Sequence, residues 1–212
     1  MRVQACMARF ACTAFRLWRE RSVGLCLAAL VAGAMLPAQA AAQSPDEPRA
    51  ISIIDEIRIG AFAHNIESNA ALVGSEKGVD INFELLFARP SFAFGNPIVD
   101  TFLRPRLHIG SSINVDGYTN QGYAGLTWNI PLPLRLSLEL TFGGTLHDGP
   151  LTGPGKAFGC PVNFRESLSL GYAVTERWRL YGTWAHMSND HLCGARNSGL
   201  TSGGVRLGYV FN

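Results

Sequence analysis

Apolar and polar residues alternate through most of the chain after residue 50, and a period of two is the pattern of β-strands with one apolar face. The clearest case is residues 134–143, where leucine or phenylalanine occupies every second position and the positions between them are polar or glycine. This part of the chain has no helical repeat and no apolar run long enough to cross a membrane as a helix. The alternation predicts eight strands, over residues 56–65, 79–87, 103–109, 123–130, 134–143, 164–174, 178–188 and 204–211.

Each predicted strand has one apolar face, while its second face carries glycine, serine and charges of both signs. Two kinds of closed barrel fit this pattern. In a soluble barrel, such as a periplasmic lipid-binding protein, the apolar face points inward. In a transmembrane barrel the apolar face points outward to lipid. The mixed charges favour the transmembrane barrel, because charges of opposite sign can fill a narrow lumen together.

The connections between the predicted strands alternate in length. Long polar segments occupy residues 66–77, 146–161 and 189–200, and tight turns occupy residues 131–133 and 175–177. If the first strand starts in the periplasm, the long segments lie outside the cell, as in outer-membrane barrels, with 89–100 and 115–118 as exceptions. The prediction is therefore an all-β fold, an eight-stranded antiparallel transmembrane β-barrel in the bacterial outer membrane. Phe211, next to the C-terminus, resembles the terminal aromatic residue of such barrels.

The first 42 residues have the pattern of a cleavable signal peptide. Five arginines precede an apolar run at 23–36, and small residues follow, so we expect cleavage after Ala40 or Ala42. A lipoprotein signal at Cys26 is disfavoured because Leu25 precedes it where a small residue is needed. Residues 43–50 form a polar, proline-containing leader. The barrel is expected to occupy residues 51–212.

Charge and cysteine content narrow the class of function. The net charge is +2 and no basic stripe is present, so nucleic acid is not an expected partner. Cys160 and Cys193 remain after removal of the signal peptide, and in an oxidising compartment we expect them to form a disulfide that fastens two outer loops. The alternative is a pair of free thiols. No CxxC or histidine-rich pattern is present, so we expect neither a metal nor another cofactor.

His186 and Ser188 lie two residues apart on the seventh predicted strand, so both side chains project from the same face. That face also carries Trp178, Leu180 and Trp184, and in a transmembrane barrel it meets lipid. A serine hydroxyl becomes a nucleophile when a neighbouring base takes its proton, and histidine suits that task near neutral pH. The pair therefore suggests an ester hydrolase whose substrate arrives from the outer leaflet. Spacing alone does not exclude a chance pair at the membrane interface.

Several motifs together resemble the outer-membrane lipid A 3-O-deacylase (acyloxyacyl hydrolase) family. They are His186-Met-Ser188-Asn189, Asn197-Ser-Gly199-Leu-Thr201, the closing strand to Phe211 and, upstream, the weaker segments 56–60, 104–108, 143–149, 164–165 and 171–172. The resemblance implies an eight-stranded barrel that removes the ester-linked acyl chain at position 3 of lipid A, the lipid part of lipopolysaccharide, without a metal. It also implies Ser188 as the nucleophile and His186 as the general base. Asn197, with either Asn189 or a loop backbone N–H, is implied as the oxyanion hole.

One position departs from the family pattern. The family places a glutamate that orients the histidine where this chain has Thr201, which supplies no charge. Glu166, predicted to face outward on the neighbouring strand, is a second candidate for the acid role, and Asp190 is a third. The missing glutamate also keeps open a non-catalytic outer-membrane barrel of adhesin or scaffold type. A homodimer is compatible with the sequence.

Overall fold

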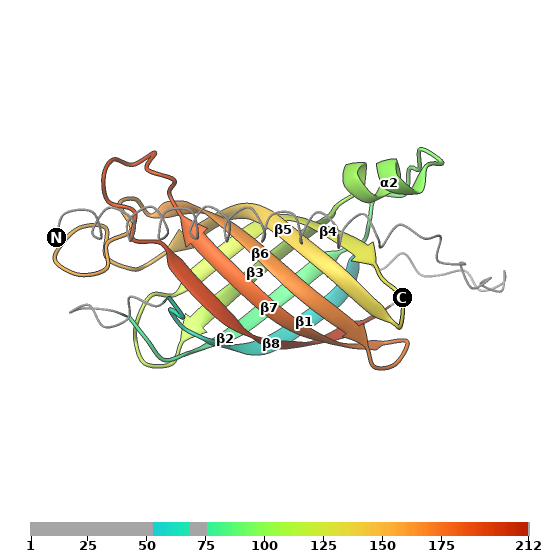
Figure 1. The fold of residues 1–212 in the computed structure, drawn as a ribbon, viewed down its shortest axis with the longest axis horizontal. Helices are drawn as coiled ribbons and strands as arrows, with labels where there is room; N and C mark the ends of the chain where they lie inside the picture. The colour runs from blue at the N-terminus through green and yellow to red at the C-terminus, as the bar shows by residue number, and fades with distance from the viewer. Residues whose placement is uncertain (1–52, 68–75, 212) are drawn as a thin grey trace, which may run out of the picture. The chain divides into compact units, whose positions relative to one another are not determined.

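The computed structural model describes residues 53–67 and 76–211, which form one closed antiparallel barrel (Figure 1). The predicted signal peptide and leader lie outside the described residues. Each strand pairs with its neighbours in chain order, and β1 closes the barrel against β8. No helix in the described part of the chain is long and apolar enough to cross a membrane. The strands are β1 (Ile54–Ala63), β2 (Val79–Phe87), β3 (Arg106–Asn114), β4 (Gln121–Pro131), β5 (Leu136–His147), β6 (Val162–Ala173), β7 (Trp178–Ser188) and β8 (Leu200–Val210).

The alternation along each strand separates an apolar exterior from a polar interior. On β1, the side chains of Ile57 and Ile59 are 44% and 50% exposed, whereas Arg58 between them is 1% exposed. The same arrangement recurs on the other strands, where exposed leucine, isoleucine and phenylalanine side chains surround the barrel. So large an apolar surface is unfavourable in water and favourable in lipid. The prediction of a transmembrane barrel is therefore confirmed, and the soluble lipid-binding barrel is excluded.

The interior of the barrel holds buried charges that neutralise one another. Arg58 donates hydrogen bonds to Glu56, Glu84 and Glu139, at donor–acceptor distances between 2.5 and 3.1 Å. It also donates to the hydroxyl of Tyr181 at 3.0 Å. Arg106 and Arg206 add further ion pairs to the same carboxylates. Because a buried charge is costly without a partner, this network explains how a narrow lumen accommodates charges of both signs.

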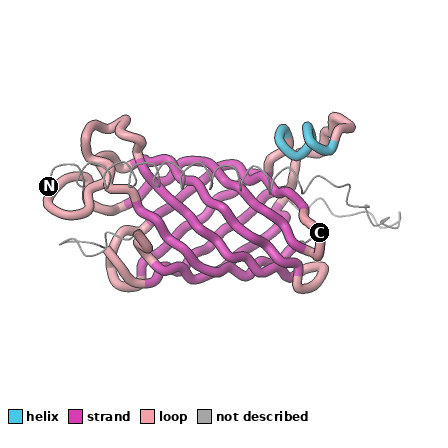
Figure 2. The backbone as a smooth tube through the Cα atoms, viewed as in Figure 1, coloured by secondary structure: helices cyan, strands magenta, loops and turns pink. Residues whose placement is uncertain are grey.

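The two ends of the barrel carry different connections, and strands make up its wall between them (Figure 2). The long connections β1–β2, β5–β6 and β7–β8 lie at one end, together with the short β3–β4 connection. At the other end lie the tight β4–β5 and β6–β7 turns and the longer β2–β3 connection. This is the predicted alternation, and it places the long loops outside the cell in the usual orientation of outer-membrane barrels. Trp178 and Tyr209 pack edge to face at the periplasmic end, with ring centroids 4.9 Å apart.

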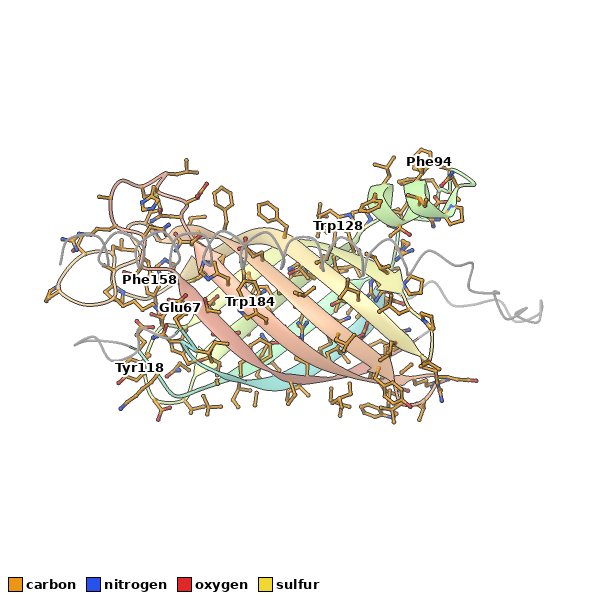
Figure 3. All side chains as sticks on the ribbon, viewed as in Figure 1. Glu67, Phe94, Tyr118, Trp128, Phe158 and Trp184 are labelled. Atoms are coloured by element: carbon orange, nitrogen blue, oxygen red, sulfur yellow. A yellow bond between two sulfur atoms is a disulfide. The ribbon has the colours of Figure 1, made fainter. Side chains whose placement is uncertain are left out.

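The third predicted strand, 103–109, began too early, because a short helix ends on its first residue, Leu103. The helix α2 (Pro97–Leu103) begins after Asn96, whose side chain accepts hydrogen bonds from the backbone N–H groups of Ile98 and Val99. An asparagine cap followed by proline is a helix start signal, which the strand prediction at 103–109 overlooked. β3 instead starts at Arg106. The indole of Trp128 on β4 donates to the carbonyl of Phe102 at 2.9 Å and joins the helix to the barrel (Figure 3).

The turn between β4 and β5 also differs from the prediction of a turn at 131–133. Leu134 and Arg135 both have positive φ, 59° and 64°, and the N–H of Leu136 donates to the carbonyl of Pro133. Two consecutive residues with positive φ give a hairpin turn whose twist matches that of the flanking strands. Leu134 is 83% exposed in this turn and therefore does not belong to the strand that the alternation predicted.

Candidate active site

His186 and Ser188 lie at the end of β7 that carries the long loops, and both belong to the outward-facing set of that strand. The positions between them, Ala185 and Met187, are buried in the interior. The imidazole of His186 lies parallel to the indole of Trp184, with centroids 6.0 Å apart and an interplanar angle of 7°. Figure 3 shows Trp184 on the barrel wall and Glu67 near the end with the long loops. The predicted outward placement of the histidine and serine agrees with this structure.

The His186 ring is held by a hydrogen bond to β8. Its Nδ1 lies 2.7 Å from the Thr201 hydroxyl, which donates in turn to a carboxylate oxygen of Glu67 at 2.5 Å. Because a hydroxyl has one hydrogen, Thr201 accepts from Nδ1–H when it donates to Glu67. The neutral ring then carries its hydrogen on Nδ1 and leaves Nε2 unprotonated, which is the form that a general base requires.

Glu67 lies in the connection after β1, where residues 66 and 67 lie against β8. The N–H of Ile66 donates to the carbonyl of Thr201 at 2.8 Å, so the next residue reaches the Thr201 hydroxyl. The Glu67 carboxylate lies 3.7 Å from His186 Nδ1 and 3.8 Å from Lys156 Nζ. Burial lowers the pKa of Lys156, although the nearby carboxylates of Glu67 and Glu76 favour its charged form. A carboxylate therefore faces the histidine from a segment that the sequence analysis treated as a loop.

The other acid candidates make no such contact. Glu166 on β6 lies directly opposite His186 in the strand register. Within residues 53–67 and 76–211, however, neither a hydrogen bond nor an ion pair joins the two side chains. Asp190 lies in the turn after β7, with a φ of 48°, and is exposed. Thr201, the first candidate from the sequence, does contact the histidine, because its hydroxyl bonds to the ring.

Ser188 is partly exposed on the outward face, opposite Phe164 of β6. In the described part of the chain its hydroxyl makes no hydrogen bond to His186, so the predicted contact between base and nucleophile is not formed in this structure. Gly199 lies against the imidazole: a Cβ on this glycine would lie 2.9 Å from His186 Cε1 and 3.3 Å from Nε2. Gly199 also has a φ of +61°, so a larger residue is disfavoured by both conformation and space.

The two asparagines predicted for the oxyanion hole differ in their free donors. Asn189 is 2% exposed, and its side-chain amide donates to the carbonyls of Phe158 at 2.6 Å and Arg196 at 2.7 Å. Its backbone N–H donates to the side-chain oxygen of Asn197 at 2.9 Å. Asn189 therefore acts as an anchor of the β7–β8 connection, with its donors occupied. Asn197 uses its oxygen in this contact and keeps its amide NH₂ as a candidate donor.

A disulfide joins Cys160, just before β6, to Cys193 in the β7–β8 connection, with the Cα atoms 5.9 Å apart. The predicted pairing is confirmed. The disulfide borders an apolar groove of about 340 Å³ on the outer surface, which extends from the site across β5 and β6. Phe142 and Phe164 stack in its wall, with centroids 5.9 Å apart. The groove also touches Asn189, so it reaches the residue next to Ser188.

The sequence comparisons give one family. Residues 108–210 match the family model of lipid A 3-O-deacylase (PagL), and this range contains β4 to β8 with the histidine and serine. No curated protein matches the chain. The family that the sequence motifs resemble is therefore confirmed over this range.

Solved structures share the fold, among them the following two. The crystal structure of the outer membrane enzyme PagL has a TM-score of 0.54 and 13% identity, over 73% of this chain and 98% of that one. The crystal structure of Neisserial surface protein A (NspA) has a TM-score of 0.50 and 11% identity, over 74% of this chain and 96% of that one. With its apolar exterior the protein is an outer-membrane β-barrel. Over residues 108–210 the chain is similar to the lipid A 3-O-deacylase (PagL) family.

Proposed function

We propose that the protein is a serine ester hydrolase that removes the 3-O-linked acyl chain from lipid A in the outer leaflet. The observation that carries the proposal is the state of His186. Its Nδ1 is hydrogen-bonded to Thr201, which leaves Nε2 as a free base two residues from Ser188 on the outward face. The family match over residues 108–210 supports lipid A as the substrate. A homodimer stays a prediction.

The reaction follows from these groups. Nε2 of His186 takes the proton of the Ser188 hydroxyl while its oxygen attacks the ester carbonyl. The amide NH₂ of Asn197 is the candidate donor to the oxyanion that forms. As this intermediate collapses, the protonated imidazole gives its proton to the sugar oxygen that leaves, and the acyl chain remains on Ser188 as an ester. Water, deprotonated by His186, then releases the fatty acid and restores the serine.

The reaction requires the Ser188 hydroxyl to approach His186. Side chains at i and i+2 on a strand face project in parallel, so the serine hydroxyl reaches the ring by side-chain adjustment without strand movement. Catalytic hydrogen bonds are often long in a site without substrate and shorten when substrate binds. The substrate ester occupies the space above Ser188 and favours this arrangement.

The apolar groove beside Ser188 supports an acyl substrate. It is open on the outer barrel surface, so a lipid chain can enter from the membrane without crossing the barrel wall. Burial of each methylene group contributes about 0.8 kcal/mol, so several methylene groups against Phe142 and Phe164 would hold the chain firmly. The oxygen-rich headgroup then remains at the interface, near the end that carries the long loops.

Purified barrel in detergent micelles, mixed with lipopolysaccharide and followed by mass spectrometry of lipid A, tests the proposal. The expected result is loss of one hydroxyacyl chain by the parent protein and no loss with Ser188→Ala or His186→Ala. Ser111→Ala is the matched control, because Ser111 also belongs to an outward-facing set, on the distant strand β3. Unchanged lipid A with the parent protein would instead favour the non-catalytic barrel.

A further inference from the structure

A base that accepts a proton from serine becomes an imidazolium, and an anion near the ring stabilises that charged form. Thr201, at the family's glutamate position, has no charge to offer. The structure brings a carboxylate to the same place by another route. Glu67 lies 3.7 Å from His186 Nδ1, and the Thr201 hydroxyl lies between the two groups and bonds to both.

The contact between Glu67 and Thr201 belongs to a fastened segment. Ile66 is bonded through its backbone N–H to the carbonyl of Thr201. Two residues earlier, His64 is buried between Asp80 and Glu76, with ring nitrogens 2.7 and 2.9 Å from their oxygens. These contacts fix the segment on both sides of Asn65, which accepts from Lys156 Nζ.

We propose that Glu67 is the acidic positioning residue of this site and that it acts on His186 through the Thr201 hydroxyl. The inference rests on the proposed deacylase function for its catalytic meaning. The Thr201 hydroxyl fixes the orientation of the imidazole by accepting a hydrogen bond from Nδ1–H. The Glu67 carboxylate supplies the negative charge that threonine lacks. In this chain the acidic residue therefore lies in the β1–β2 connection instead of on β8. The position on β8 holds the threonine hydroxyl.

Charged side chains lie on three elements near the histidine. Glu67 approaches from the β1–β2 connection, Glu166 lies opposite on β6, and Lys156 lies beside Glu67 in the β5–β6 connection. Glu67 is distinguished from Glu166 by its hydrogen-bonded path to the ring. Lys156 contacts the second oxygen of Glu67 and so holds the carboxylate without lying between it and the ring.

The first test needs no activity. NMR titration of His186, in the Ser188→Ala background, follows the pH at which the ring gains its proton. Loss of the carboxylate in Glu67→Gln makes protonation harder, so the transition should move to lower pH by about one pH unit, a tenfold change in proton affinity. Glu166→Gln should move it less, and Glu176→Gln, in the exposed turn after β6, should leave it in place.

The second test is kinetic. In the deacylation assay, Glu67→Gln and Thr201→Val should each lower kcat by at least about tenfold, with little change in KM and with the acid limb of the kcat/KM profile moved to lower pH. Thr201→Glu in the Glu67→Gln background returns a carboxylate to the ring and should recover much of the rate. A loss caused only by loop disruption would not be recovered in this way.

The outcomes separate the two proposals. An unchanged His186 titration in Glu67→Gln, or a larger shift in Glu166→Gln, overturns the role of Glu67 even if deacylation occurs. A parent protein that leaves lipid A intact refutes the deacylase function, while the titration still decides whether Glu67 acts on His186.

Discussion

We call the buried contact of His64 with Asp80 and Glu76 the His64 clamp. It makes the free energy of unfolding of the barrel depend on pH. Both ring nitrogens face carboxylate oxygens, Asp80 at 2.7 Å and Glu76 at 2.9 Å, and only a protonated ring can donate to both. Burial lowers the pKa of His64, but the hydrogen bonds to Asp80 and Glu76 outweigh burial and raise it to about 9 from 6.5. Between about pH 6.5 and about pH 9, the folded protein therefore keeps a proton on His64 that the unfolded chain has released.

The direction and size of the effect follow from this difference. Because the pKa is raised in the folded state, the stabilisation is fully present below about pH 6.5 and is lost as the pH rises through about 9. Each pH unit between the two values is worth about 1.4 kcal/mol, so the free energy of unfolding should fall by about 3 kcal/mol across the range. Urea unfolding of the barrel in detergent, at about pH 6.5 and about pH 9.5, measures this change.

Two variants isolate the contribution of the clamp. His64→Gln cannot carry the charge, so its unfolding free energy should be lower at the acidic end and should change much less with pH. His191→Gln is the matched control, because His191 is exposed in the β7–β8 connection, and it should follow the parent protein. If the parent protein and His64→Gln lose the same free energy between the two pH values, the reasoning about the clamp is refuted.

Three further predictions concern the lumen, the disulfide and the groove. Arg58→Met removes the cation that pairs with three buried carboxylates and leaves them only the ion pairs to Arg106 and Arg206, so it should lower the free energy of unfolding by about 3–5 kcal/mol, measured by urea unfolding. An unchanged midpoint, like that expected for Arg135→Met in the exposed β4–β5 turn, would contradict this. Replacement of Cys160 and Cys193 by serine opens a link of sequence separation 33 and should cost up to about 4 kcal/mol in the same assay, while equal stability of the oxidised and serine forms would show that the link adds nothing. Phe164→Ala removes contacts in the groove worth about 1.5 kcal/mol and should lower kcat/KM for lipid A by about tenfold. Phe83→Ala, an exposed phenylalanine on β2, should have no such effect, and equal losses in the two variants would argue against an acyl site in the groove.

The strand pattern predicted the barrel well because each strand has two faces with opposite demands. A residue such as Ile59 must meet lipid and its neighbour Arg58 must meet a charged lumen, so the period of two persists through all eight strands. The prediction was wrong where local signals compete with alternation. Asn96 and the following proline start a helix before β3, and Leu134 sits in a turn with positive φ although it continues the alternating pattern.

The candidate site was predictable only in part. His186, Ser188 and Thr201 are close in sequence or on adjacent strands, so strand parity and the family resemblance place them together. Glu67 was missed because it lies in a polar connection, far from His186 in sequence, and no local pattern marks it. The one signal in the sequence was indirect: a family position that lacked its glutamate, which indicated that a carboxylate had to be sought elsewhere.

The different roles of Asn189 and Asn197 could not be predicted from the sequence. Both fit the composition of an oxyanion hole, but the hydrogen bonds of Asn189 to Phe158 and Arg196 depend on how the β5–β6 and β7–β8 connections pack together. Long connections have no periodic pattern, so their mutual packing cannot be inferred from alternation. The disulfide was the exception, because two remaining cysteines in an exported chain leave few choices.

If Ser188 attacks the ester, it carries the acyl chain as an acyl-enzyme intermediate, and detection of this intermediate tests the role of the serine directly. The barrel is mixed with lipopolysaccharide, quenched in acid within the first turnover, digested and analysed by mass spectrometry. We expect a peptide containing Ser188 that carries one hydroxyacyl group, and no such peptide in His186→Ala. If lipid A loses its acyl chain while Ser188 never carries it, and Ser188→Ala releases the chain at the parental rate, the serine is not the nucleophile.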